Sequence, residues 1–178
     1  MSSNRLRAAL AIAGLALLPL GACSKKDSGA VAYATQSSAR SAKAAAAWLA
    51  NNARDPGVKA LPDGLQYRIV RAGPADGPLP RAGDDVRVNY EGALVDGTIF
   101  DSSYGRGQPG VFTVGELVPG WNEALQLMHP GDIWYLYIPP SLGYGPTDRG
   151  PIPGNSVMVF KMELISVLPK SGTGGANA

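Results

Sequence analysis

The sequence predicts an α+β domain, in which an antiparallel sheet of about five to six strands wraps around one short helix and a further helix precedes the sheet. Apolar and polar residues alternate in several short segments after Gly64, which is the pattern of half-buried strands. Residues 121–128 instead space their apolar side chains as a helix does. A run rich in alanine lies before all of these segments and predicts the N-terminal helix.

The composition is that of one folded domain. Of 178 residues, 45% are hydrophobic and 17% are charged, which is enough apolar matter for a core and too little charge for a disordered chain. Lysine and arginine number 16 and aspartate and glutamate 14, and two of the arginines lie in a leader that we expect to be removed. The remaining chain is electrically balanced, so we expect no nucleic acid partner.

The first 22 residues are typical of an export signal. Arg5 and Arg7 precede an apolar run over residues 8–20, which is shorter than the roughly 20 residues needed to cross a bilayer. The run ends in Leu20-Gly21-Ala22-Cys23, which resembles the lipobox of bacterial lipoproteins. We therefore expect cleavage before Cys23 and a lipid such as palmitate on its thiol, while an incidental thiol remains the alternative.

The position and number of cysteines bear on location and stability. Cys23 is the only cysteine, so the chain forms no internal disulfide and must be stabilised by its core. Ser24, the residue after it, favours the outer membrane over the inner one. We expect the protein to be anchored in the cell envelope through Cys23, on the periplasmic side.

The alanine-rich run over residues 31–54 predicts a helix that ends at Asp55-Pro56-Gly57, where proline removes a donor and glycine frees the backbone. Its apolar face is mostly alanine, with Trp48 and Leu49 near one end. Because such a face buries little apolar area, we favour a spacer or packing helix and a monomeric protein, with a dimerisation helix as the alternative.

The strands and the second helix follow in order. Residues 65–70 and 86–90 alternate as strands do, and Asp96-Gly97 predicts a hairpin with a primed turn, which requires positive φ at its centre. A helix from Trp121 to Met128 ends at His129-Pro130-Gly131. Further strands are predicted over residues 111–114, 133–138 and 157–167, and the glycine-rich residues 169–178 predict a disordered tail.

The residue types exclude most enzyme classes. His129 is the only histidine, and together with the single cysteine this excludes a histidine-based triad and a zinc cluster. No glycine-rich phosphate loop precedes a helix. We expect no metal and no cofactor, and we interpret His129 as a surface residue in a turn.

Five short sequence motifs contain aromatic and branched residues near predicted loops. Taken singly, such residues usually belong to a core. In this order they resemble the FKBP-type peptidyl-prolyl cis/trans isomerases, the tacrolimus-binding immunophilins, over about residues 61–168. The motifs are Val88-Asn89-Tyr90-Glu91-Gly92, Gly97-Thr98-Ile99-Phe100-Asp101-Ser102-Ser103, Val118-Pro119-Gly120-Trp121, Leu142-Gly143-Tyr144-Gly145 and Ile152-Pro153-Gly154-Asn155-Ser156.

The resemblance implies a pocket for proline, with Trp121 as its floor. It also implies that Glu116 contacts ligands through its backbone. Gly110 departs from the pattern, because the best-known eukaryotic members have an aromatic wall residue there, so we expect one side of the pocket to be more open. The implied catalytic residues are Tyr90, Phe100, Asp101, Tyr144 and Phe160, and the implied substrate-binding residues are Arg106, Phe112, Glu116, Leu117, Val118, Trp121 and Ile152.

The resemblance implies an enzyme that accelerates rotation about Xaa-Pro bonds of exported polypeptides, and it makes tacrolimus and rapamycin candidate inhibitors. A binding module or holdase chaperone of the same fold, without useful catalysis, remains the alternative. The helix and the segment after it resemble the bacterial branch, whose members carry a helical arm that dimerises in several cases. We divide the chain into a signal peptide (1–22), a lipidated linker with the helix (23–60), an isomerase domain (61–168) and the tail (169–178).

Overall fold

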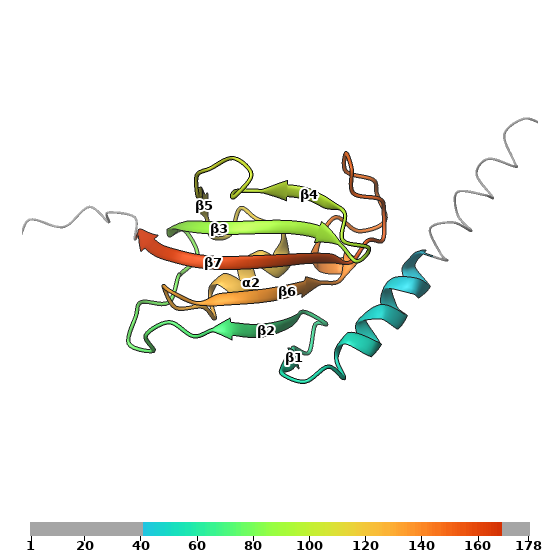
Figure 1. Cartoon of the computed structure of the whole chain (residues 1–178), viewed down its shortest axis with the longest axis horizontal. Helices are drawn as coiled ribbons and strands as arrows, with labels where there is room; N and C mark the ends of the chain where they lie inside the picture. The colour runs from blue at the N-terminus through green and yellow to red at the C-terminus, as the bar shows by residue number, and fades with distance from the viewer. Residues whose placement is uncertain (1–40, 169–178) are drawn as a thin grey trace, which may run out of the picture.

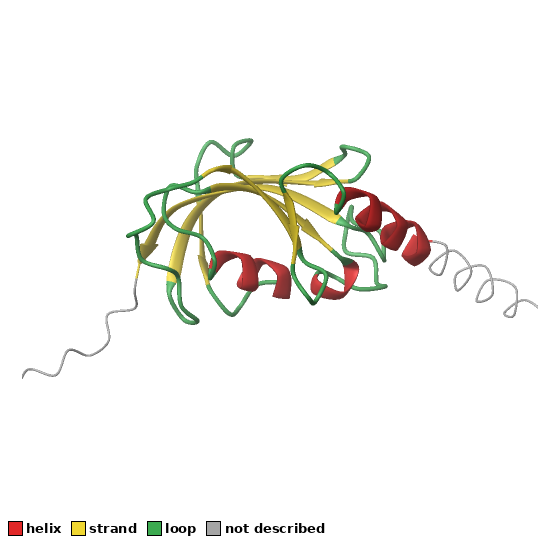
Figure 2. Cartoon of the chain, turned by 90° about the horizontal axis from the view of Figure 1, so that it is seen from below, coloured by secondary structure: helices red, strands yellow, loops and turns green. Residues whose placement is uncertain are grey.

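An antiparallel sheet of seven strands curves around a short helix in the computed structural model of the chain (Figures 1 and 2). The structure describes residues 41–168, so the predicted signal peptide, Cys23, the first part of the alanine-rich helix and the predicted tail lie outside it. A helix over residues 41–52 precedes the sheet. The other elements are β1 (Val58–Ala60), β2 (Gln66–Arg71), β3 (Asp85–Leu94), β4 (Ile99–Ser102), β5 (Gly110–Thr113), α2 (Pro119–Leu125), β6 (Ile133–Ile138), the 3-10 helix η1 (Pro140–Leu142) and β7 (Met158–Leu168).

The strands lie in the order β1-β2-β6-β7-β3-β4, and β5 also pairs with β3. β4 pairs with residues 91–93 of β3 and β5 with residues 85–88, so the loop over residues 103–109 interrupts this edge of the sheet. The architecture confirms the predicted fold class. β1 is the strand that the sequence analysis missed, because three residues carry no alternation and β1 is defined by its pairing with β2.

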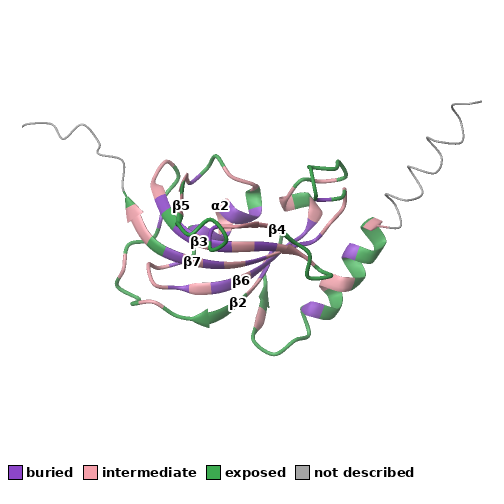
Figure 3. Cartoon of the chain, turned by 45° about the horizontal axis from the view of Figure 1, so that its top comes forward, coloured by how far each residue is buried: buried purple, intermediate pink, exposed green. Residues whose placement is uncertain are grey.

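The core lies between the concave face of the sheet and α2 (Figure 3). Burial alternates along β3 and over the first seven residues of β7, and β6 buries Trp134 and its last three residues. α2 contributes Trp121, Ala124 and Leu125, of which the last two are fully buried. Truncating one such leucine to alanine typically costs about 2 to 5 kcal/mol, so α2 and the sheet depend on each other.

α2 begins two residues before the predicted start and ends three before the predicted end. Pro119 occupies its first turn, where a missing N–H and a restricted φ are tolerated. Met128 lies in a turn after the helix, where its N–H donates to the carbonyl of Leu125 at 3.2 Å. Met128 is nevertheless fully buried beside Leu125, so an apolar residue at this position extended the apparent helical pattern past the end of α2.

The β3–β4 hairpin is present, but the predicted primed turn is wrong. Gly97 has φ +87°, whereas Asn155 is the one non-glycine residue with positive φ in the described chain, so Asp96 does not adopt the primed conformation. The Gly97 N–H donates to the Leu94 carbonyl at 2.9 Å, and the Leu94 N–H donates to the Thr98 carbonyl at 2.9 Å. The loop therefore has three residues and ends in a left-handed glycine, which is the next most common hairpin geometry.

The N-terminal helix packs against the domain, at the end of the sheet near β1 (Figure 1). The side-chain amide of Asn52 donates to Gln66 Oε1 at 2.9 Å, and Gln66 Nε2 donates to the carbonyl of Leu49 at 3.0 Å. The ring of Trp48 lies 5.8 Å from that of Tyr137. No helix in residues 41–168 is long and apolar enough to cross a membrane.

A pair of carboxyl groups joins the β1–β2 turn to α2. Burial, followed by a hydrogen bond with Asp63, raises the pKa of Glu123 to about 7. Hydrogen bonding with Glu123 lowers the pKa of Asp63, and the N–H of Leu65 also donates to Asp63 Oδ1 at 3.1 Å. The pair thus holds one proton on Glu123 at mildly acidic pH.

We expect this pair to make the folded protein less stable as pH rises from about 5 to 8. Glu123 ionises near 4.5 when unfolded and near 7 when folded, so its stabilising contribution is complete below 4.5 and is lost as pH rises through 7. After allowance for solvent screening, we expect a loss of about 1 kcal/mol, or about 4 °C in Tm. Thermal unfolding of Glu123→Gln should lack this slope, and the exposed control Asp76→Asn should keep it. An equal slope in Glu123→Gln and the parent would contradict the assignment.

Candidate active site

An apolar cavity of about 340 Å³ opens between the concave face of the sheet and the loops beside α2. Every residue that the sequence analysis assigned to the site lines this cavity, except Arg106 and Glu116. Pro151 also lines it. The lining residues are Tyr90 of β3, Phe100 and Asp101 of β4, Phe112 of β5, Leu117 and Val118 before α2, Trp121 of α2, Tyr144, Pro151 and Ile152 of the loop before β7, and Phe160 of β7.

The floor of the cavity is the indole of Trp121, which is 5% exposed. The rings of Tyr90, Phe112 and Phe160 meet it edge to face, with centroids 5.1, 5.5 and 5.2 Å away. Phe100 meets Phe160 in the same way at 5.5 Å. Edge-to-face pairs contribute about 0.5 to 1.5 kcal/mol each beyond burial, so these rings hold one another in place. The result is a largely apolar surface of rings that pack against one another.

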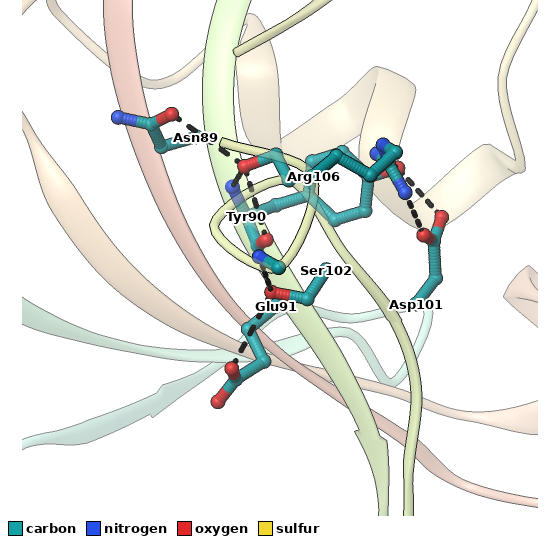
Figure 4. Close-up of polar contacts among 8 residues, drawn as sticks. Asn89, Tyr90, Glu91, Asp101, Ser102 and Arg106 are labelled. Atoms are coloured by element: carbon teal, nitrogen blue, oxygen red, sulfur yellow. Dashed lines mark hydrogen bonds and ion pairs between the residues drawn. The ribbon is translucent and has the colours of Figure 1, made fainter. Parts of the chain in front are cut away.

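A network of polar groups joins Tyr90, Asp101 and Arg106 (Figure 4). The Tyr90 hydroxyl donates to Asp101 Oδ2 at 2.6 Å and accepts from the Arg106 guanidinium at 2.7 Å. Arg106 also forms an ion pair with Asp101, and its guanidinium carbon lies 5.4 Å from the centre of the Tyr90 ring. Arg106 therefore orients Tyr90 and Asp101 from outside the cavity.

This network sets the charges at the site. Burial, followed by the hydrogen bond to Asp101, raises the pKa of Tyr90 above its ordinary value. Burial opposes ionisation of Asp101, but hydrogen bonds from Tyr90 and Arg106 and the charge of Arg106 outweigh it and lower its pKa. At neutral pH Tyr90 is a neutral hydroxyl and Asp101 a carboxylate, so neither is poised to exchange a proton.

Ser103 fixes the loop that carries Arg106, a role that the sequence analysis missed. Ser103 is fully buried, and its hydroxyl accepts from the Tyr90 N–H at 2.8 Å. The Ser103 N–H donates to the Tyr90 carbonyl at 2.9 Å, and the Arg106 N–H donates to the Ser103 carbonyl at 3.2 Å. Ser103 belongs to one of the five motifs, which is a signal in the sequence, but its hydrogen-bond partner Tyr90 lies on β3, 13 residues earlier in the chain.

Asn122 was also missed, and it shapes the loop before α2. Its side-chain oxygen accepts from the Gly115 N–H at 2.7 Å, and its amide donates to the Leu117 carbonyl at 2.8 Å. These bonds place Leu117 at the cavity. Glu116, in the same turn, is exposed and does not line the cavity, although its N–H donates to the Thr113 carbonyl at 3.2 Å.

Two glycines allow the rings to pack as they do. A Cβ on Gly92 would stand 2.5 Å from Phe160 Cε1 and 2.7 Å from Phe100 Cε2. At Gly110 we expected a more open side. Instead the ring of Phe112 lies so close to the glycine that an added Cβ would clash with it. The bare backbone at both positions lets a ring occupy that space.

Other candidate chemistry lies away from the cavity. His129 Nδ1 is 3.0 Å from the Gly77 carbonyl, in a loop that does not line the cavity. The described residues contain no group of three or more side chains that could hold a metal ion.

A curved antiparallel sheet that holds an aromatic cavity against one short helix defines the FKBP-like isomerase fold. The sequence model for the family described as FKBP-type peptidyl-prolyl cis-trans isomerase matches residues 77–165, and a model for the domain amino terminal to such isomerases matches residues 22–69. The chain belongs to the FKBP-type peptidyl-prolyl cis-trans isomerase family.

Similar proteins come from several bacteria. The chain is 50% identical over 125 residues to the peptidyl-prolyl cis-trans isomerase Mip of Coxiella burnetii, a match that covers 70% of this chain and 54% of that protein. It is 48% identical over 122 residues to the outer membrane protein MIP of Legionella longbeachae, with 68% and 52% covered. The chain thus spans about half the length of the curated relatives it matches.

Solved structures agree with the fold. The crystal structure of FkpA from Escherichia coli matches with a TM-score of 0.74 at 39% identity, covering 80% of this chain and 66% of that one. A peptidyl-prolyl cis-trans isomerase from Pseudomonas syringae matches with a TM-score of 0.68 at 38% identity, covering 74% and 96%.

We expect Gly92→Ala to disturb the site, because the added methyl group displaces the rings of Phe100 and Phe160. Overpacking of this kind costs about 1 to 3 kcal/mol of stability. We expect kcat/KM on a prolyl peptide to fall about tenfold in the folded variant. Gly105→Ala is the matched control, because a Cβ there meets atoms at 3.6 Å or more. Equal kcat/KM for the two folded variants would show that the ring positions do not depend on Gly92.

Proposed function

We propose that this protein is a peptidyl-prolyl cis/trans isomerase that accelerates rotation about Xaa-Pro bonds and assists the folding of exported envelope proteins. The observation that supports it most is the cavity floored by Trp121 and walled by four further aromatic rings, with Tyr144 at its open side. Its volume of about 340 Å³ has room for a proline ring and its neighbours.

Rotation of a peptide bond faces a barrier of about 18 to 20 kcal/mol, because resonance gives the bond partial double-bond character. At the twisted midpoint this resonance is lost, and the carbonyl becomes less polar than in the planar ground state. A dry apolar pocket therefore favours the twisted amide over the planar one, which is the condition for catalysis. The chemistry requires no nucleophile, metal or cofactor.

In this proposal the proline ring lies over Trp121, between Tyr90, Phe112 and Phe160. The carbonyl before proline leans toward Asp101 and Tyr144, with the Tyr144 hydroxyl and the Val118 N–H as donors. Asp101 acts through Tyr90 and Arg106, which it holds in place, and not as an acid or base. Tacrolimus and rapamycin are candidate inhibitors of the same cavity.

We also propose a location and a division of the chain. Residues 1–22 form a signal peptide, and residues 23–60 form a linker with the helix, anchored by lipid on Cys23 at the periplasmic side of the outer membrane. Residues 61–168 form the isomerase domain, followed by a tail over residues 169–178. A relative is named an outer membrane protein, which supports this location.

We propose that the soluble protein is a monomer, and a stable dimer in sedimentation at micromolar concentration would contradict this.

A protease-coupled assay with an Xaa-Pro peptide tests the proposed activity. We expect Phe100→Ala or Phe160→Ala to lower kcat/KM at least tenfold, which corresponds to about 1.4 kcal/mol of transition-state stabilisation. Asp101→Asn should lose less and His129→Ala almost nothing, because the apolar walls stabilise the twisted amide. Circular dichroism must first confirm folding, since loss of a buried ring costs about 3 to 5 kcal/mol. Full activity in folded Phe160→Ala beside an inactive Asp101→Asn would reverse the assignment, and an inactive parent would leave a binding module.

The rate should change little between about pH 6 and 8, because the pKa of Tyr90 is raised and that of Asp101 is lowered, away from this range. Glu123, with a pKa of about 7, lies on α2 outside the cavity lining. The profile should therefore also be recorded in Glu123→Gln. A bell-shaped profile that persists in this variant would indicate acid–base catalysis at the site.

Cys23→Ser should release the protein from the membrane fraction, because it removes the thiol that carries the lipid in this proposal. It should leave kcat/KM unchanged, because Cys23 lies far along the chain from the residues of the cavity. Fractionation of envelopes measures the first effect and the peptide assay the second. A Cys23→Ser protein that still sediments with membranes, as the parent does, would show that the anchor lies elsewhere.

A further inference from the structure

A loop between η1 and β7, residues 143–157, carries part of the cavity wall, and we call it the flap. Tyr144, Pro151 and Ile152 of the flap line the cavity. The Asn155 N–H donates to the Gly145 carbonyl at 2.8 Å, and the Gly154 N–H donates to Asp148 Oδ1 at 2.7 Å. These bonds join flap residues to one another, so they give the flap its shape.

The N-terminal helix lies against the base of the flap. The Ser41 hydroxyl donates to the carbonyl of Gly154 at 3.2 Å, although the two residues are 113 positions apart. Ala45, one turn further along the helix, is 8% exposed. Figures 1 and 2 place the helix at the end of the sheet where the flap emerges. The flap therefore has a support from outside its own sequence.

Two shallow grooves run along the helix and meet at this contact. One, of about 350 Å³, lies between the helix, the β3–β4 turn and flap residues 153–157. The other, of about 430 Å³, lies between the helix, η1 and the first flap residues. Ala45 and Asn155 line both grooves, so they form the ridge where the helix and the flap meet.

The helix is held on the sheet independently of the flap. Asn52 and Gln66 are 8% and 6% exposed, and the bonds from Asn52 to Gln66 and from Gln66 to Leu49 attach the last helical turn to β2. Trp48 packs on Tyr137 of β6. A buried amide that loses its partner leaves an unsatisfied polar group away from water, so this attachment is specific. The helix thus connects β2 and β6 at one end with the flap at the other.

We propose that the N-terminal helix is a positioning element of the active site, which holds the flap so that Tyr144 and Ile152 face the floor at Trp121. The inference rests on the proposed function, because the flap matters to catalysis only if the cavity binds prolyl substrates. Ala45 and Ser41 are positioning residues, since neither lines the cavity. A flap that loses its support must be ordered by the substrate, which weakens apparent binding in proportion to the fraction of competent molecules.

The test compares Ala45→Arg with Ala47→Arg in the full chain. Ala45 lies in the contact, whereas Ala47 is exposed and lines neither groove, and both changes have the same effect on helix propensity. We expect Ala45→Arg to raise KM for an Xaa-Pro peptide about three- to tenfold with kcat within about twofold, as expected for a loss of preorganisation. Amide hydrogen exchange over residues 144–156 should accelerate in Ala45→Arg and stay unchanged in Ala47→Arg.

A second variant is needed if the helix of Ala45→Arg stays docked on the domain. Gln66→Ala removes the attachment of the helix to β2, and loss of the Trp48–Tyr137 contact by NMR reports undocking in either variant. A folded, undocked variant with flap exchange and KM equal to those of Ala47→Arg would overturn the proposal. A parent with no turnover would instead contradict the proposed function, while the exchange measurement would still decide whether the helix supports the flap.

Discussion

The register of β3 against β7 is the constraint on which the site depends. These strands pair from Asp85 opposite Leu168 to Leu94 opposite Met158, and this register sets Gly92 directly opposite Phe160. The bare glycine leaves room for the rings of Phe160 and Phe100, and Phe160 in turn packs edge to face on Trp121. A slip of one residue would turn every inward side chain of the strand to the solvent face and remove the cavity altogether.

Tyr90 separates the apolar and polar parts of the site. Its ring belongs to the aromatic cluster, while its hydroxyl lies in the network with Asp101 and Arg106 (Figure 4). The carboxylate is thereby satisfied by hydrogen bonds and an ion pair at the edge of the cavity, and the floor stays apolar. A pocket that favours a less polar amide needs this separation, because a free charge beside the substrate would hold water there.

Contacts between distant segments join the supports of the cavity. The β1–β2 turn reaches α2 through Asp63 and Glu123, and the N-terminal helix reaches β2 through Asn52 and the flap through Ser41. The walls formed by Tyr90 and Phe160 belong to strands with extensive pairing, whereas the flap is a loop whose backbone bonds are mostly local and which the Ser41 hydroxyl contacts from the N-terminal helix. The flap is accordingly the wall that depends least on strand pairing.

The sequence by itself determined the fold class, because alternation along residues 65–70 and 86–90 and helical spacing over residues 121–128 are local patterns with a physical cause. The family resemblance carried by the five motifs also named most of the residues that line the cavity, although no local pattern assigned them there. Only the tertiary structure decided the hairpin turn type, the exposed position of Glu116 outside the lining, the roles of Ser103 and Asn122, and the seat of the N-terminal helix. Each of these depends on partners in other segments or on backbone angles that several residue types can adopt, so no local pattern encodes them.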